Sequence, residues 1–97
     1  MDQTLKQTLA VECERIRCFL HANQLVQANA IAQKIESTAS EVIAKECRCN
    51  EVETHPLWKV FRAALRCKNK ILSGITTEAI DEANTLMEHI VLMEQSK

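Results

Sequence analysis

Residues 25–43, LVQANAIAQKIESTASEVI, decide the fold. Apolar side chains recur there at alternating spacings of three and four residues, at Leu25, Ala28, Ala32, Ile35, Ala39 and Val42. This spacing places them on one face of an α-helix and does not suit a β-strand, in which alternate residues share a face. We expect Asn23 to be the N-cap. The pattern continues through residues 37–40, which favours one long helix, whereas Thr38 and Glu41 form a capping-box signature that fits two shorter helices. Both alternatives stay open.

Three other segments have the same periodicity, and each predicts an amphipathic helix. The stripe of the first is Leu5, Leu9, Cys13, Ile16 and Leu20. The stripe of the next is Leu57, Val60, Ala64, Cys67 and Ile71. The stripe of the last is Ala79, Ala83, Leu86, Ile90 and Met93.

Proline, glycine and threonine residues mark the ends of these segments. Pro56 suits the first turn of a helix, where its missing N–H is not needed, and we expect Thr54 or His55 to cap that helix. Gly74 suits the residue just past a helix end, which adopts the left-handed conformation. Thr76 is then expected to cap the last helix.

The chain is expected to fold as a single domain of two antiparallel helical hairpins. We place the hairpins at residues 1–48 and 56–97, joined by a loop at 49–55. One glycine, one proline, one tryptophan and two phenylalanines in 97 residues are too few for the turns and strands of a β-sandwich or barrel. We therefore predict an all-α protein, packed as a four-helix bundle or as a short tetratricopeptide-like stack.

The two predicted hairpins are similar when the sequence is shifted by 51 residues. The stripe positions then coincide, as for Ala28 with Ala79 and Ala32 with Ala83. Few of the paired residues are identical, so common packing demands explain the match as well as duplication does.

Composition limits the compartment and the partners. A net charge of −1 excludes a globally basic nucleic-acid binder, although not a local basic face. Charged residues interrupt the apolar positions of the first helix, so we expect no cleaved signal and no membrane span. The five cysteines are odd in number, and we interpret them as reduced thiols of a cytoplasmic protein. Cys13 and Cys67 lie on helical stripes and are expected to be buried.

No group of residues favours catalysis, and we expect no enzyme activity, no cofactor and no metal site, because the chain has little loop from which to build a pocket. The best candidate metal site combines Cys47, Cys49, His55 and Cys67, which are donor types that zinc binds. A single residue between Cys47 and Cys49 is too short for a zinc knuckle, and Cys67 would have to leave its stripe. The sequence also lacks a phosphate-binding glycine loop.

Charge is divided between the last two helices. Four basic residues fall at spacings of three, four and four, which places them on one face of the third helix: Lys59, Arg62, Arg66 and Lys70. The fourth helix is acidic, with Glu78, Asp81, Glu82, Glu88 and Glu94. The basic face would dock an acidic partner or a nucleic-acid backbone. Alternatively, it would pair with the acidic helix and with Glu46, Glu51 and Glu53. We favour internal pairing, because the net charge is near zero and base-reading side chains are missing.

Apolar residues beyond the stripes indicate a protein-binding surface. Trp58 and Phe61 either fill the core or anchor an interface, and we favour the core. The second and fourth helices carry additional apolar residues on the shoulders of their stripes, and we expect these to bind an amphipathic helix of a partner: Val26, Ile31, Ile43, Met87 and Val91.

Two short segments carry a family resemblance. Residues 27–32, QANAIA, and 78–83, EAIDEA, each follow a turn and resemble the second helix of tetratricopeptide-type hairpins. Within that class, residues 27–35 and the Pro56-Leu57-Trp58 start of the third helix are similar to the tetratricopeptide-like chaperones of bacterial type III secretion. This resemblance covers about a third of the chain. It implies a protein that holds a segment of another protein in the cytoplasm, and it assigns no functional residues.

The sequence therefore predicts a small cytoplasmic protein-binding module, a chaperone or adaptor, whose basic face steers an acidic partner. A domain of this size gains stability from a partner or from forming a homodimer. The alternative is a homodimeric regulator that binds nucleic acid through the basic face of the third helix. A third interpretation is a redox or zinc sensor that uses Cys47 and Cys49.

Overall fold

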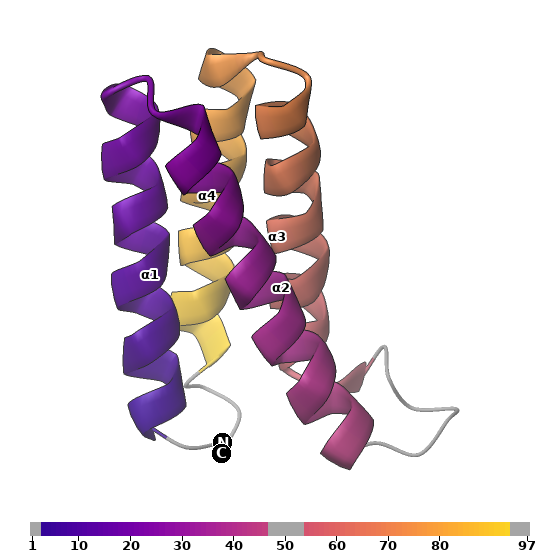
Figure 1. Ribbon diagram of the computed structural model, residues 1–97. Helices are drawn as coiled ribbons and strands as arrows, with labels where there is room; N and C mark the ends of the chain where they lie inside the picture. Colours follow the sequence, from indigo (N-terminus) through magenta and orange to yellow (C-terminus); the bar gives the residue numbers. More distant parts are fainter. Residues whose placement is uncertain (1–2, 47–53, 94–97) are drawn as a thin grey trace.

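The computed structural model describes residues 3–46 and 54–93, and these residues form four α-helices (Figure 1). The helices are α1 (Gln3–His21), α2 (Leu25–Glu46), α3 (Leu57–Leu72) and α4 (Thr76–Leu92). No strand occurs within the two described ranges, which confirms the prediction of an all-α protein. α2 is continuous over 22 residues, so residues 37–40 do not divide it. Most of the predicted loop, 49–55, lies outside the described residues.

The helices form a closed ring. α1 packs against α2 and α4, and α3 packs against the same two helices, so α2 and α4 lie at opposite corners. Figure 1 shows α1, α3 and α4 side by side, while α2 crosses obliquely from a start beside α1 to an end beside the beginning of α3. Because the first and last helices are in contact, a single core is enclosed. Of the two predicted arrangements, the structure is the four-helix bundle.

The turns of the two hairpins have the same geometry, 51 residues apart. In the first turn Asn23 has a φ of 61°, and the N–H of Gln24 donates to the carbonyl of Phe19 over 2.8 Å. In the second turn Gly74 has a φ of 78°, and the N–H of Ile75 makes the corresponding bond. Both are Schellman turns, in which a left-handed residue ends the preceding helix. The prediction that Asn23 caps α2 is therefore wrong: this residue ends α1.

The helix starts differ in how they are capped. Thr76 is the first residue of α4, after Ile75, and no side chain caps this helix, so the prediction of a threonine cap is wrong. At α3, Nδ1 of His55 accepts a hydrogen bond from the backbone N–H of Leu57 over 3.0 Å. Pro56 occupies the N-cap position and no side-chain cap hydrogen bond forms there, so the prediction that Thr54 or His55 is the N-cap is wrong. The His55 ring nevertheless satisfies the N–H of Leu57, from the residue before the N-cap.

The predicted stripes form the core. Their buried members are Leu9, Cys13, Ile16, Leu20, Ala28, Ala32, Ile35, Ala39, Leu57, Val60, Ala64, Cys67, Ile71, Ala79, Ala83, Leu86, Ile90 and Met93. The burial differs from the stripes at a few positions. Leu5 and Leu25 are half-buried, and Ala63 is fully buried although it lies off the stripe. One residue of α2 was assigned wrongly. After Ala39 the buried residue is Ile43, 5% exposed, whereas Val42 is half-buried. Because α2 crosses the bundle obliquely, its buried face rotates from α1 toward α3 along its length.

Candidate functional site

The far end of α2 and the beginning of α3 are joined by a histidine. Nε2 of His55 lies 2.8 Å from Oε1 of Glu46, the last residue of α2. Nδ1 of the same ring accepts the N–H of Leu57, so Nε2 carries the proton and donates to the carboxylate. Leu57 is fully buried and anchors the start of α3 in the core. These contacts set the position of the next two turns of α3 relative to α2.

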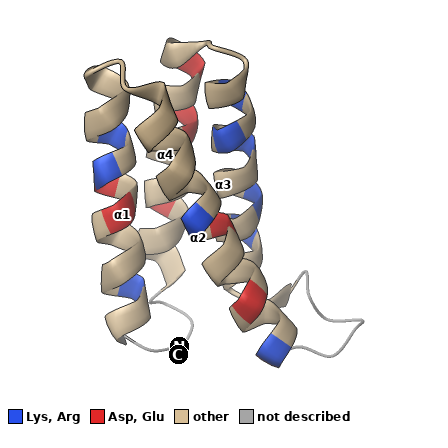
Figure 2. Ribbon diagram, viewed as in Figure 1, with Lys and Arg blue, Asp and Glu red and all other residues tan. Residues whose placement is uncertain are grey.

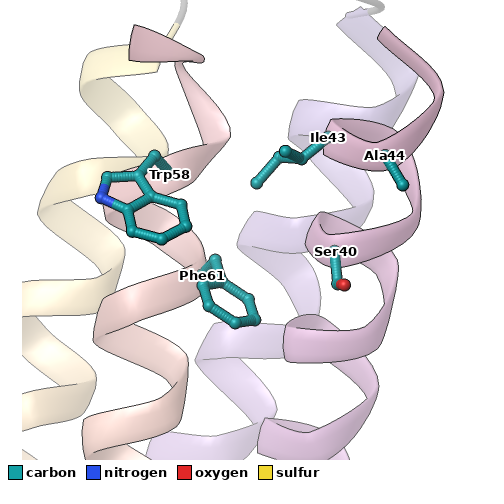
Figure 3. A pocket seen from close by; sticks show the side chains of 5 residues that line it. All are labelled: Ser40, Ile43, Ala44, Trp58 and Phe61. Carbon is teal, nitrogen blue, oxygen red and sulfur yellow. The ribbon is translucent and has the colours of Figure 1, made fainter. Parts of the chain in front are cut away.

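An apolar groove lies between these helix ends (Figure 3). It has a volume of about 220 Å³ and is lined by Ser40, Ile43 and Ala44 of α2 and by Trp58 and Phe61 of α3. Figure 3 shows the two rings on one side, with Ile43 reaching across toward Trp58. We call this feature the α2/α3 groove.

The two aromatic rings are partly buried. The centroids of Trp58 and Phe61 are 5.6 Å apart, at an interplanar angle of 27°. Both rings pack against the core and also line the α2/α3 groove. They therefore fill the edge of the core, as favoured from the sequence, and they also present an aromatic surface at the groove.

A second hollow, of about 320 Å³, lies on the other side of Trp58. It is lined by Trp58, Lys59, Arg62, Arg66 and His89, and we call it the basic hollow. The guanidinium of Arg62 lies over the indole ring of Trp58, 5.9 Å from its centroid. The pKa of His89 is lowered from its usual value by burial and then by the positive charges of Lys59 and Arg66, while Glu88 acts in the opposite direction.

Half of the predicted basic face forms ion pairs with the neighbouring helix α4. Figure 2 shows basic residues along α3 and acidic residues along the neighbouring α4. Lys70 pairs with Glu78 over 2.7 Å, and Arg66 pairs with Glu82 over 3.4 Å. The internal pairing favoured from the sequence is thus found for these two cations.

The other half of the basic face has no such partner. Among residues 3–46 and 54–93, no carboxylate forms an ion pair with Lys59 or Arg62. A further cation of α3, Lys68, pairs with Glu36 of α2 over 2.7 Å. Within the described ranges, the positive charge of α3 that no carboxylate pairs is therefore concentrated near its start, beside Trp58. Of the other carboxylates expected to pair with this face, Glu46 pairs with His55, and Glu51 and Glu53 lie outside the described residues.

The structure does not bring the predicted apolar shoulder residues together. The shoulders of α2 and α4 lie at opposite corners of the ring, because α1 and α3 separate these two helices. Val26 is 81% exposed near the start of α2, and Val91 is 52% exposed near the end of α4. Ile31 and Met87 are half-buried against the core. The predicted cradle between α2 and α4 is therefore not one surface.

Ile43 is the single predicted shoulder residue that lines the α2/α3 groove. It was expected on an exposed shoulder and is instead buried, 5% exposed, at the floor of that groove. The position was misassigned because the stripe continues from Ala39 with a spacing of four rather than three.

The candidate zinc ligands either make other contacts or lie outside the described residues. Cys67 is fully buried and its thiol donates to the carbonyl of Ala79 over 3.7 Å. His55 is held by Glu46 and Leu57, as described above. Cys47 and Cys49 lie outside the described residues. Within the described part of the chain, no three metal-binding side chains gather into a site.

The buried thiols are poor nucleophiles. Cys13 donates to the carbonyl of Ala83 over 3.3 Å, one turn of α4 away from the bond made by Cys67. Burial raises the pKa of each thiol to about 12. Both thiols are therefore protonated at neutral pH, as expected for small buried hydrophobes.

Sequence analysis missed several residues of the site. Ser40 and Ala44 line the α2/α3 groove although they lie off the apolar stripe. His89 completes the basic hollow from α4, and no local pattern marks it. Outside the site, the ion pair of the buried Glu12 of α1 with Lys34 of α2, over 2.6 Å, was also missed, because it depends on the contact between two helices. Spacing along a single helix contains no signal for such contacts.

No helix in the described ranges combines the length and the apolar character needed to cross a lipid bilayer. No family model, curated protein or solved structure matches this chain.

Proposed function

We propose that this protein is a protein-binding module that holds an amphipathic helix of a partner in the α2/α3 groove. The bound helix directs apolar side chains at Trp58 and Phe61 and acidic side chains at the basic hollow. The chaperone or adaptor role expected from the sequence is a form of this function, and holding a secreted subunit in the cytoplasm is one example.

The observation that carries the proposal is the position of the aromatic pair. Trp58 is the only tryptophan of the chain, and it lines both the α2/α3 groove and the basic hollow. Partly exposed aromatic rings beside apolar side chains are typical anchors of protein interfaces, because they bury a large area with little loss of side-chain freedom. The Trp58 ring thus lies between the apolar α2/α3 groove and the basic hollow.

The charge of α3 supports a partner that carries acidic side chains. Lys59 and Arg62 have no carboxylate partner in the described part of the chain, whereas Arg66 and Lys70 do. A helix with acidic residues beside its apolar face would pair with the two uncompensated cations while its apolar face covers the groove. A nucleic-acid backbone is less well matched, because it needs a long row of cations, and half of this row is already paired.

The test uses two designed helical peptides of about 18 residues, or about five turns. Both have the same leucine and alanine stripe, flanked by glutamate in one peptide and by lysine in the other. The fluorescence emission of Trp58, the one tryptophan of the chain, reports binding directly. We expect the acidic peptide to shift this emission and to bind at least about tenfold more tightly than the basic peptide, a preference that salt reduces.

Two matched variants locate the binding surface. Ala44→Arg places a bulky side chain on the rim of the α2/α3 groove, and Ala30→Arg makes the same change at an exposed position of α2 that does not line it. We expect Ala44→Arg to weaken binding of the acidic peptide about tenfold and Ala30→Arg to leave it unchanged. Equal effects of the two variants, or equal binding of the two peptides, would contradict the proposal. Tighter binding of an oligonucleotide than of the acidic peptide would favour the nucleic-acid alternative.

A further inference from the structure

We propose that the basic hollow is a binding site for a phosphate monoester. The proposed function uses the same hollow for acidic side chains of the partner. Binding of a free phosphate requires nothing of the α2/α3 groove, so the two proposals can be tested separately.

The hollow has an excess of positive charge. Its lining contains Lys59, Arg62 and Arg66, together with His89 and Trp58, and no carboxylate. Two carboxylates lie close to it. Glu82 pairs with Arg66 over 3.4 Å, and Glu88 precedes His89 on the exposed side of α4. Neither forms an ion pair with Lys59 or Arg62, so among the described residues the hollow has more cations than carboxylates.

The donors of the hollow are held in place. The Arg62 guanidinium is stacked over the Trp58 ring, 5.9 Å from its centroid, which orients the planar N–H edge of the arginine. Figure 3 shows the indole nitrogen of Trp58 on the edge of the ring that faces away from Ile43 and toward α4. In the described ranges no acceptor bonds to this N–H, and the same ring lines the hollow with His89 of α4. An oxyanion in the hollow would accept hydrogen bonds from both groups.

This arrangement suits a phosphate monoester better than a carboxylate. A monoester carries close to two negative charges at neutral pH and has three terminal oxygens, so one group can contact Arg62, Lys59 and the indole N–H. A carboxylate carries one charge and two oxygens and would leave one of the cations unpaired. A phosphodiester also carries one charge, which is why a nucleic-acid backbone fits the hollow less well.

The positive charges of the hollow also act on His89. Its pKa is lowered first by burial and then by Lys59 and Arg66 of α3, while Glu88 of α4 itself raises it. α1 also packs against α4, but none of its described residues contributes to this shift of the His89 pKa. A bound dianion would oppose Lys59 and Arg66 and raise the pKa of His89, so the histidine is a second reporter beside Trp58.

The experiment titrates the full chain with inorganic phosphate at constant ionic strength. The readouts are the single indole N–H resonance and the pH titration of the His89 ring by nuclear magnetic resonance. We expect phosphate and sulfate to shift the indole resonance with saturation and to raise the pKa of His89. We expect acetate and chloride to produce neither change. No saturable shift with phosphate, or the same shift with chloride, would overturn the proposal.

Matched variants locate the anion. Lys59 is exposed and belongs to the hollow, so Lys59→Gln tests the site without disturbing the core. We expect Lys59→Gln and Arg62→Gln each to weaken phosphate binding about tenfold or more, the scale of one hydrogen bond to a charged group. Lys70→Gln removes a cation of the same helix outside the hollow and should leave binding unchanged. If Lys70→Gln weakens binding as much as Lys59→Gln, the effect is diffuse charge attraction and the proposal is wrong.

A further comparison identifies the source of the phosphate group. The acidic peptide described above is prepared with a serine at its edge, in phosphorylated and unphosphorylated forms, and both are compared with glycerol phosphate. A gain on phosphorylation that Lys59→Gln abolishes, with weak binding of glycerol phosphate, assigns the site to a phosphorylated side chain of a partner. Equal binding of glycerol phosphate and the phosphopeptide assigns it to a small phosphate ester. If the peptide does not bind but inorganic phosphate does, the proposed function fails and the anion site remains.

Discussion

Asn23 and Gly74, 51 residues apart, occupy equivalent left-handed positions, with φ of 61° and 78°, at the turns of the two hairpins. Each residue ends its helix with the same pair of backbone hydrogen bonds, and α2 and α4 each begin two residues later. The correspondence that the sequence shows at the stripes therefore extends to the turns. Two different residues satisfy the same backbone requirement, because glycine and asparagine are the residues that adopt this conformation most readily.

The first prediction concerns these two turns. Gly74→Ala should destabilise the protein by about 1 kcal/mol, because the left-handed conformation disfavours a Cβ. A Cβ at this position would meet no atom within 4 Å, so the loss is conformational rather than steric. Asn23→Gly should leave the free energy of unfolding unchanged or raise it by up to about 1 kcal/mol. Urea unfolding followed by circular dichroism measures both. A Gly74→Ala variant as stable as the original chain would contradict the explanation.

The second prediction concerns His55. His55→Ala removes the acceptor for the Leu57 N–H and the bond to Glu46, and it should lower the free energy of unfolding by about 1 to 2 kcal/mol. His55→Asn keeps a side-chain oxygen that can accept the N–H and should recover part of this loss. Glu46→Ala is the control, because it breaks only the second bond and Glu46 is exposed. If His55→Ala and Glu46→Ala lower the free energy of unfolding equally, the hydrogen bond from the Leu57 N–H to His55 contributes nothing to stability.

The third prediction concerns the thiols. Cys13 and Cys67 are fully buried and their pKa values are raised to about 12, so alkylation of the folded protein should spare both and modify the exposed Cys18. Peptide mapping by mass spectrometry before and after unfolding measures this difference. In the unfolded chain these thiols ionise near 9.0, so their contribution to stability is complete below that pH and is lost as the pH rises toward 12. Rapid alkylation of Cys67 in the folded protein would contradict its place in the core.

The fourth prediction compares two ion pairs of α3. Lys68 and Glu36 are each about one-fifth exposed and join α3 to α2, whereas Lys70 and Glu78 are more exposed. A double-mutant cycle with alanine should give a coupling of up to about 1 kcal/mol for Lys68 and Glu36. The coupling between Lys70 and Glu78 should be smaller and should fall further at high salt, because solvent screens it. A stronger coupling for the exposed pair would reverse this ranking.

The fifth prediction concerns pH. The pKa of His89 is lowered in the folded protein by burial, Lys59 and Arg66, so the unfolded chain binds a proton more readily. The associated stability is present above the unfolded value of 6.5 and is lost as the pH falls through the lower folded value. Unfolding experiments at about pH 7.5 and 5.5 should show this decrease, and His89→Gln should reduce it. His21, exposed at the end of α1, supplies the control variant His21→Gln.

Much of the fold could be predicted from local spacing. The stripes identified the buried face of every helix, because a residue that recurs with the helical period faces the same side. The error at Val42 and Ile43 has a different origin: the buried face of α2 rotates as this helix crosses from α1 to α3. The crossing is a property of the assembled helices.

Less of the candidate site could be predicted. Trp58 and the basic face of α3 were identified from residue type and spacing. Trp58 lines both hollows, and three of the basic residues, Lys59, Arg62 and Arg66, line the basic hollow. Their neighbours Ser40, Ala44 and His89 belong to other helices and were not identified. The expected surface between α2 and α4 is absent from the described residues because α1 and α3 separate those helices.

The sequence by itself determined that the chain is helical, which side of each helix is buried, and that a left-handed residue follows α3, since all of these follow from interactions within a few residues. The tertiary structure alone decided that the hairpins close into a ring and that the groove lies between α2 and α3. It also decided that Lys59 and Arg62 lack the carboxylates that neutralise Arg66 and Lys70 within the described ranges. The reason is that helix adjacency depends on how four buried faces pack around one core, which no single periodic pattern contains.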